Sequence, residues 1–201
     1  MVKADCGGCN GCSRCCHGMG NSTILDPYDV YRMTTGMGKS MQELLAASVE
    51  LNVVDGVILP NLKMQGAEEA CAYLDGEGRC SIHPYRPGIC RLFPLGRYYE
   101  NGGFSYFLQT GECAKENRSK IKVSKWIDTP DLTRNQQFTL QWHDLLHAME
   151  ERLTGEDEGK QREENLLLLR LFYLLPYEGT IDFYTQFTER MEHWNGQNGQ
   201  I

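Results

Sequence analysis

The chain has 201 residues, a hydrophobic content of 41% and a formal net charge of −7 at pH 7. This length fits one domain, or one compact domain with a helical extension. The acidic balance argues against a nucleic-acid partner, since proteins that bind the phosphate backbone carry clustered Lys and Arg. No segment approaches the roughly 20 apolar residues that cross a bilayer, so we expect no membrane partner either.

The N-terminal segment is rich in cysteine and glycine. It lacks the apolar region of a secretory signal, which predicts a cytoplasmic location where disulfides are rare. The chain has nine cysteines, and five of them fall between Cys6 and Cys16. In a reducing compartment such a cluster indicates metal ligation rather than a disulfide framework. We expect a glycine-rich loop over residues 1–20.

The spacing of the cysteines within this loop indicates the kind of cofactor that they bind. Cys6-x2-Cys9-x2-Cys12-x3-Cys16 matches bacterial ferredoxins, although His17 stands where proline usually follows. Zinc sites use the same x2 spacing, so the spacing indicates a metal without choosing between zinc and iron. The adjacent side chains of Cys15 and Cys16 should point apart. They are expected to serve different sites, to include one free reactive thiol, or to bridge two neighbouring centres.

Two helices are predicted after the loop. Asp26-Pro27 begins the first, with Asp26 as cap, and it runs to about Thr35 before Gly36 and Gly38 close it. Ser40 opens the second, and Glu43 completes a capping box. The helical period of apolar positions in the second helix extends to Ser48/Val49.

Residues 51–109 predict short strands. Runs at 57–59, 70–74 and 79–82 are bounded by Gly, Asp or Pro, with a turn at 75–78 between the last two. A hairpin is expected from 96–99 and 104–108 around Glu100-Asn101-Gly102-Gly103. The prolines between His83 and Pro94 exclude a regular strand or a long helix there. The remaining thiols lie in this region or at its end: Cys71, Cys80, Cys90 and Cys113.

The C-terminal part is predicted to be helical. A polar connector at 115–125 precedes helices at 136–153, 160–175 and 181–194. We therefore expect a cysteine-rich metal-binding domain over 1–125 and a helical extension over 126–201. His143 and His147 share a helix face and could bind a metal, but the amphipathic pattern favours a solvated or partner-facing pair. His17 and His83 lie beside cysteines and are the better candidates for non-thiol ligands.

Three groups of residues together resemble the YkgJ-like cysteine-cluster family over about residues 9–113. They are Cys9-x2-Cys12-x2-Cys15-Cys16, Cys71-x-Tyr73-Leu74 and Cys80-Ser-Ile-His83-x2-Arg86-Pro87-x2-Cys90-Arg91-x-Phe93-Pro94. The resemblance implies binding of zinc, iron or an iron–sulfur cluster through Cys9, Cys12, Cys15, Cys16, Cys71, Cys80, Cys90 and Cys113. Cys6 is an addition to the family pattern, and His83 stands where the family often has Tyr.

The surplus of thiols favours an iron–sulfur cluster, 4Fe-4S above other types, because a structural zinc ion usually needs only four ligands. We therefore expect a redox or electron-transfer role with a redox partner protein, and all nine cysteines as candidate cluster ligands. Arg86 and Arg91 flank Cys90 and could offset the negative charge of the thiolates, or form carboxylate pairs.

The alternatives are a zinc-binding structural or metal-trafficking module, and an accessory part of a protein-modifying enzyme. The last rests on a related region in flagellin lysine N-methylases. The sequence assigns no catalytic residues, because nucleotide loops and catalytic triads are absent. The expected fold class is α+β: a small irregular cysteine-rich core with short antiparallel strands, packed by N-terminal and C-terminal helices.

Overall fold

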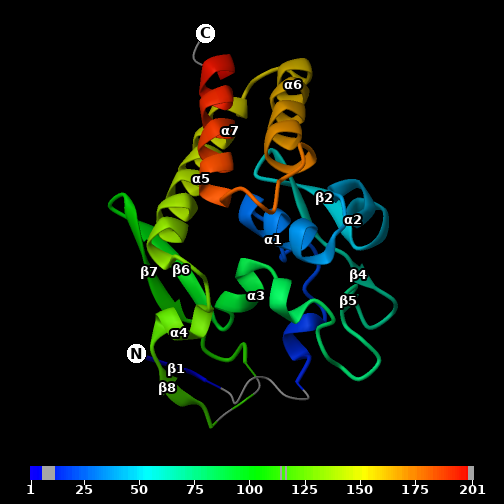
Figure 1. The fold of residues 1–201 in the computed structure, drawn as a ribbon, viewed down its shortest axis with the longest axis vertical. Coiled ribbons are helices and arrows are strands. Elements are labelled where there is room, and N and C mark those ends of the chain that lie inside the picture. Colours follow the sequence, from blue (N-terminus) through cyan, green and yellow to red (C-terminus); the bar gives the residue numbers. More distant parts are fainter. Residues whose placement is uncertain (6–11, 114, 116, 199–201) are drawn as a thin grey trace.

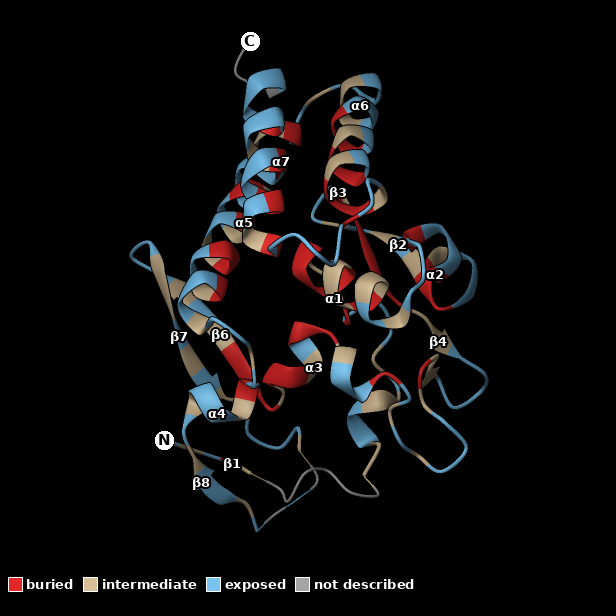
Figure 2. Cartoon of the chain, viewed as in Figure 1, coloured by how far each residue is buried: buried red, intermediate tan, exposed pale blue. Residues whose placement is uncertain are grey.

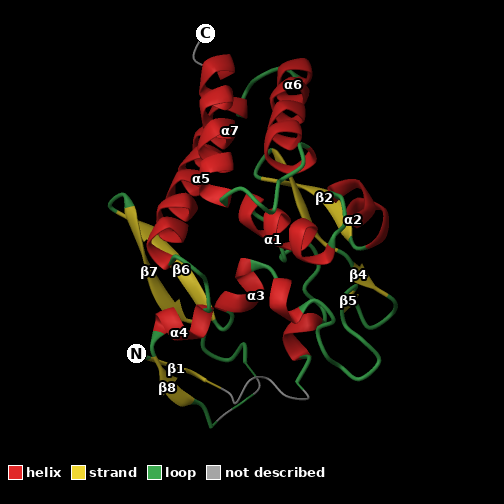
Figure 3. Ribbon diagram, in the orientation of Figure 1, coloured by secondary structure: helices red, strands yellow, loops and turns green. Residues whose placement is uncertain are grey.

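A computed structural model describes residues 1–5, 12–113, 115 and 117–198. The predicted α+β class is confirmed: helices pack together with short antiparallel strand pairs (Figure 1, Figure 3). One of these strand pairs, at residues 49–62, contributes to the main core. The helices are α1 (Pro27–Met37), α2 (Met41–Ala47), α3 (Gly88–Leu92), α4 (Val123–Ile127), α5 (Leu132–Leu153), α6 (Glu158–Leu169) and α7 (Phe183–Asn198). None of the helices in the described part of the chain is long and apolar enough to cross a membrane.

The strands of the described residues form four separate antiparallel pairs. They are β1 (Val2–Asp5) with β8 (Ser119–Ile121), β2 (Val49–Val54) with β3 (Val57–Leu62), β4 (Met64–Gln65) with β5 (Ala70–Cys71), and β6 (Leu95–Glu100) with β7 (Gly103–Leu108). No pair is extended by a third strand in this part of the chain, so each depends on helices or loops for packing.

Local sequence signals set the starts of the first two helices as predicted. The Asp26 side chain accepts a hydrogen bond from the Asp29 amide at 2.8 Å, and Asp29 returns one from the Asp26 amide at 3.3 Å. Ser40 and Glu43 form the same reciprocal capping box. α1 ends at Met37, two residues beyond the expected end, because Gly38 takes the left-handed conformation of a C-cap at φ 64°.

Several element boundaries differ from the sequence prediction. Val49 begins β2 instead of ending a helix. The strand expected at 70–74 is reduced to β5, and residues 79–82 contribute only an isolated bridge between Leu74 and Cys80. The predicted hairpin is present as β6–β7, with Asn101 and Gly102 both at positive φ in the turn.

The two ends of the expected cysteine-rich region also hold unpredicted structure. Residues 2–5 form β1 rather than loop, and the expected connector at 115–125 contains β8 and the start of α4. The register aligns Val2 with Ile121 and Asp5 with Ser119. This pairing joins the N-terminus to a segment more than a hundred residues away, and Figure 1 shows it below α4.

The main core is shared by the N-terminal elements and the C-terminal helices (Figure 2). Tyr28 of α1 packs against Phe138 of α5 and Phe183 of α7. Tyr173, in the π-helical turn Arg170–Leu174 after α6, donates a hydrogen bond to the Leu25 carbonyl at 3.1 Å. The helical extension is thus continuous with the core that supports the cysteine region.

Candidate metal centre

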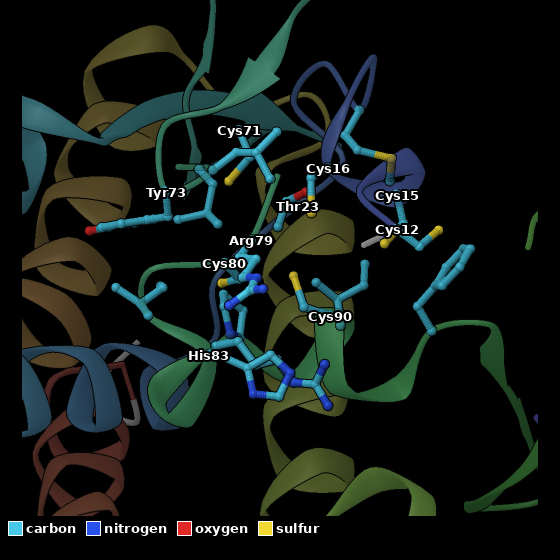
Figure 4. A pocket seen from close by; sticks show the side chains of 18 of the residues that line it. Cys12, Cys15, Cys16, Thr23, Cys71, Tyr73, Arg79, Cys80, His83 and Cys90 are labelled. Carbon is cyan, nitrogen blue, oxygen red and sulfur yellow. The ribbon is translucent and has the colours of Figure 1, made fainter. Parts of the chain in front are cut away.

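A cavity of about 320 Å³ lies among the N-terminal loop, β5, the loop after it and α3 (Figure 4). Six of the cysteines line it: Cys12, Cys15, Cys16, Cys71, Cys80 and Cys90. The rest of its wall is largely apolar, with Met19, Tyr73, Phe93 and Trp126 among the contributors. Residues separated by nearly eighty positions in the sequence therefore present thiols to one shared cavity.

Backbone hydrogen bonds hold the first group of thiols against β5. Arg14–Cys16 forms a 3₁₀ turn, closed by a bond from the Cys16 amide to the Ser13 carbonyl at 2.8 Å. An isolated antiparallel bridge pairs His17 with Ala70, which places Cys16 opposite Cys71. The Cys15 and Cys16 thiols also hydrogen bond to each other. Both therefore line one cavity, although adjacent side chains are expected to point apart.

A tight turn brings Cys80 to the same place. The Asp75 side chain accepts hydrogen bonds from the amides of Glu77 and Arg79, and the Leu74–Cys80 bridge closes the turn. The Ser81 hydroxyl then donates to the Tyr73 carbonyl at 2.9 Å. The turn predicted at 75–78 is confirmed, and its function is to aim Cys80 at the cavity.

Cys90 is positioned by the contact between α3 and α1. The Asp29 carboxylate on α1 accepts a hydrogen bond from the Gly88 amide at 2.6 Å, at the start of the five-residue helix that carries Cys90. Asp29 is only 2% exposed. Its role was not predicted, because the sequence shows only a helix-capping partner for Asp26. No signal within a few positions of Asp29 indicates this contact, because Gly88 lies 59 positions away in the sequence.

The thiols influence one another's ionisation. The hydrogen bond from Cys16 lowers the pKa of Cys15 to about 6, and the same bond raises the pKa of Cys16. Burial, followed by nearby charged groups that include other cavity thiols, raises the pKa of Cys90, and burial also raises the pKa values of Cys71 and Cys80. Without a cation the cavity therefore resists holding several thiolates at once.

Arg86 and Arg91 were both expected beside the thiols, but only one of them lies there. Arg86 lines the cavity, and its charge acts on Cys15 and Cys80. Arg91 instead turns toward α1: it is 5% exposed, lies beside Asp29 and over the Tyr28 ring, and donates to the Arg86 carbonyl at 2.9 Å. Of the two, only Arg86 is placed to offset thiolate charge directly.

The histidines and the remaining cysteines predicted as ligands differ in whether they line the cavity. His83 lines the cavity, where burial and then the Arg86 charge lower its pKa. His17 is not on the cavity wall, and its Nδ1 atom lies 3.3 Å from the Glu68 carbonyl. Cys113 lies between β7 and β8 and does not line the cavity. Cys6 and Cys9 lie outside the described residues.

The chemistry of the cavity fits a soft, thiol-preferring metal. Its described wall contains six thiols and no carboxylate, and thiolates select zinc, copper(I) and iron–sulfur clusters. As the described side chains stand, no three histidine, cysteine or carboxylate groups are close enough to hold a metal ion. Binding there would require the thiols to move together and to release protons.

A comparison with protein-family models identifies a family for much of this region. A family model described as "CxxCxxCC: Putative zinc- or iron-chelating domain" matches residues 8–109. The matched range contains seven of the nine cysteines and excludes Cys6 and Cys113. No curated protein and no solved structure matches the chain.

Proposed function

Because the chain belongs to the CxxCxxCC family of zinc- or iron-chelating domains, we propose that its thiol-lined cavity binds iron as an iron–sulfur cluster. The family resemblance predicted from the cysteine motifs is confirmed by this membership, and metal chelation is the activity that the family carries. We further propose that the cavity thiols are the ligands of this cluster and that it serves in redox chemistry.

The observation that carries the proposal is the number of thiols around one cavity. Six line it, whereas a single zinc ion takes four protein ligands. The surplus suits a cluster, or two metals that share thiolates. A bound 4Fe-4S cluster would supply one-electron transfer at a potential set by net charge, hydrogen bonds and solvent exposure. Of the remaining candidates, Cys113 could serve a second site, and Cys6 and Cys9 lie outside the described residues.

The surrounding residues of this chain would tune such a centre. Arg86 would offset the negative charge of the thiolates, and the apolar wall would limit the access of water. Cys15 is the exposed member of the group, so the opening beside it is where a redox partner protein would approach. A cytoplasmic location, which keeps free thiols reduced, is part of the same proposal.

Anaerobic purification followed by metal analysis tests the proposal. We expect visible charge-transfer absorption, iron and labile sulfide in comparable amounts, and a cluster signal in EPR or Mössbauer spectra. Colourless protein with stoichiometric zinc from iron-replete cells would overturn it in favour of a structural or metal-trafficking zinc module. A methyltransferase-like activity of the chain itself, which rests only on the related region in flagellin methylases, would require binding of S-adenosylmethionine, and equilibrium dialysis measures that binding.

A further inference from the structure

The charged residues are distributed unevenly between the two parts of the chain. Residues 126–201 carry fourteen Asp or Glu and six Lys or Arg, whereas residues 1–125 carry thirteen and fourteen. The net negative charge of the protein therefore comes from the helical extension. Figure 1 shows α6 and α7 of this extension at the end of the molecule opposite to β1, β8 and α4.

The stretch 115–125 is strongly basic, since five of its eleven residues are Lys or Arg. It contains β8 and the start of α4, and β8 pairs with β1 at the N-terminus. Four lysines on these elements are exposed: Lys3, Lys120, Lys122 and Lys125. We call these four residues the basic patch.

Few carboxylates oppose the basic patch on the described parts of these elements. Asp5 of β1 accepts a hydrogen bond from the Ser119 hydroxyl at 3.1 Å, and Asp128 directly follows α4. The carboxylates of α6 and α7 are at the other end of the molecule, and exposed charges are largely screened beyond about 8 Å at physiological ionic strength. A partner that docks at the basic patch is therefore attracted by it, although the net charge of the protein is −7.

The basic patch adjoins the thiol cavity through α4. This short helix packs against β1 and against α3, which carries Cys90. Trp126 of α4 lines the cavity, and its indole nitrogen donates a hydrogen bond to the Phe93 carbonyl at 3.1 Å. Ile89 lines the same cavity and is 41% exposed although it is apolar. A protein that contacts the patch would therefore also cover an apolar part of the cavity wall.

We propose that the redox partner of this protein is a small acidic electron-transfer protein, which docks on the basic patch and the adjoining cavity wall. The inference rests on the proposed function, because it names the partner of that same site. Complementary charge orients the partner and speeds its association more than it raises affinity. Electron-transfer complexes are weak and bury small interfaces, which suits four lysines beside a short apolar wall.

Fluorescence anisotropy of a labelled plant-type ferredoxin, used as a small acidic redox protein, measures docking on the protein as purified. We expect binding at low ionic strength that weakens about tenfold or more as the salt concentration rises to about 0.5 M. Absence of ferredoxin binding at low ionic strength would overturn the proposal. Tighter binding of a single-stranded oligonucleotide at the same salt concentration would assign the patch to a nucleic acid and would overturn it too.

Charge-reversal variants locate the docking surface. Lys120→Glu and Lys125→Glu should each weaken ferredoxin binding about threefold or more at low ionic strength, because each replaces an attraction by a repulsion. Arg162→Glu is the matched control, since Arg162 is exposed on α6 and the variant has the same change in net charge. It should leave ferredoxin binding nearly unchanged. Equal weakening in all three variants would show that net charge alone determines binding, and would overturn the proposal.

The docking proposal and the proposed function can fail separately, because anisotropy does not depend on which metal the cavity holds. Metal analysis of the same preparations accompanies the binding measurement. Zinc in place of a cluster would overturn the proposed function. A cluster-containing protein that does not bind ferredoxin would overturn the docking proposal alone.

Discussion

The Asp29 carboxylate and the Gly88 amide, 59 positions apart in sequence, are joined by a 2.6 Å hydrogen bond. This bond links the first helix of the core to the short helix that presents Cys90. Arg91, on the same short helix, is buried beside the Asp29 carboxylate. One buried acidic side chain therefore sets where a cavity thiol stands.

Replacement of Asp29 tests this link. Asp29→Ala should lower the free energy of unfolding by about 3 kcal/mol, because it leaves the Gly88 amide unpaired and Arg91 without its neighbouring carboxylate. Asp29→Asn retains an acceptor for the amide and should lose less. Urea denaturation at neutral pH measures both. Equal losses in the two variants, or none, would contradict the assigned role.

Single Cys→Ser variants should show which cysteines are needed for metal binding and which are not. Cys90→Ser should sharply reduce the metal bound per protein, because hydroxyl is a poor ligand for thiol-preferring metals. Cys113→Ser is the matched control, and it should retain the metal of the cavity, since Cys113 does not line it. Elemental analysis of anaerobically purified variants gives the result. Loss of all metal in Cys113→Ser would show that the described cavity is not an independent site.

The charge of Arg86 should matter more than that of its neighbour Arg79, although both line the cavity. Arg86→Gln should weaken metal binding roughly tenfold at low ionic strength, because thiolate charge loses its nearby cation. Arg79→Gln should have a smaller effect, since Arg79 is exposed and pairs with Glu77 at 3.7 Å. Competition with a chromogenic chelator measures both affinities. Equal losses of affinity in the two variants would contradict this, because they would show that the overall positive charge near the cavity matters and the position of Arg86 does not.

Asp26 and Asp29, the acidic pair at the start of α1, should make the free energy of unfolding depend on pH. Burial and then the Asp29 charge raise the pKa of Asp26 to about 7, against about 3.9 for an unfolded aspartate. The folded state therefore binds more protons, so this group's contribution to stability is full below about pH 4 and is lost as the pH rises through about 7.

Asp26→Asn should remove that loss and keep the cap, because Asn is also a good N-cap. The free energy of unfolding of the variant, relative to the parent, should rise between about pH 4 and pH 7. Urea denaturation of the parent and the variant at several pH values, with the same amount of bound metal, measures this difference in unfolding free energy. The pH dependence that the thiols contribute is the same in both proteins and cancels. A difference that stays constant with pH would contradict a raised pKa at Asp26.

Features that depend on neighbours in sequence were predictable. The capping box of Ser40 and Glu43 and the turn at Asn101-Gly102 depend on residues a few positions apart, and the structure contains both. The cysteine motifs predicted the family in the same way. Six of the candidate thiols do share one cavity, although sequence alone could not group them.

Features that depend on distant contacts were not predictable. Val2–Asp5 has too little pattern to indicate a strand, and its partner β8 lies in a polar segment. Gly36 looks like a helix terminator, but it lies within α1, where the Tyr85 ring occupies the space of a side chain. Arg91 resembles a thiolate partner because it follows Cys90, whereas the helix turns it toward Asp29.

The bridge between His17 and Ala70 has a consequence for metal uptake at the cavity. It holds the turn that carries Cys15 and Cys16 against β5, so these thiols share the cavity wall with Cys71, Cys80 and Cys90 in the folded chain. Capture of a metal by one of these thiols would therefore place it at a high effective concentration relative to the next.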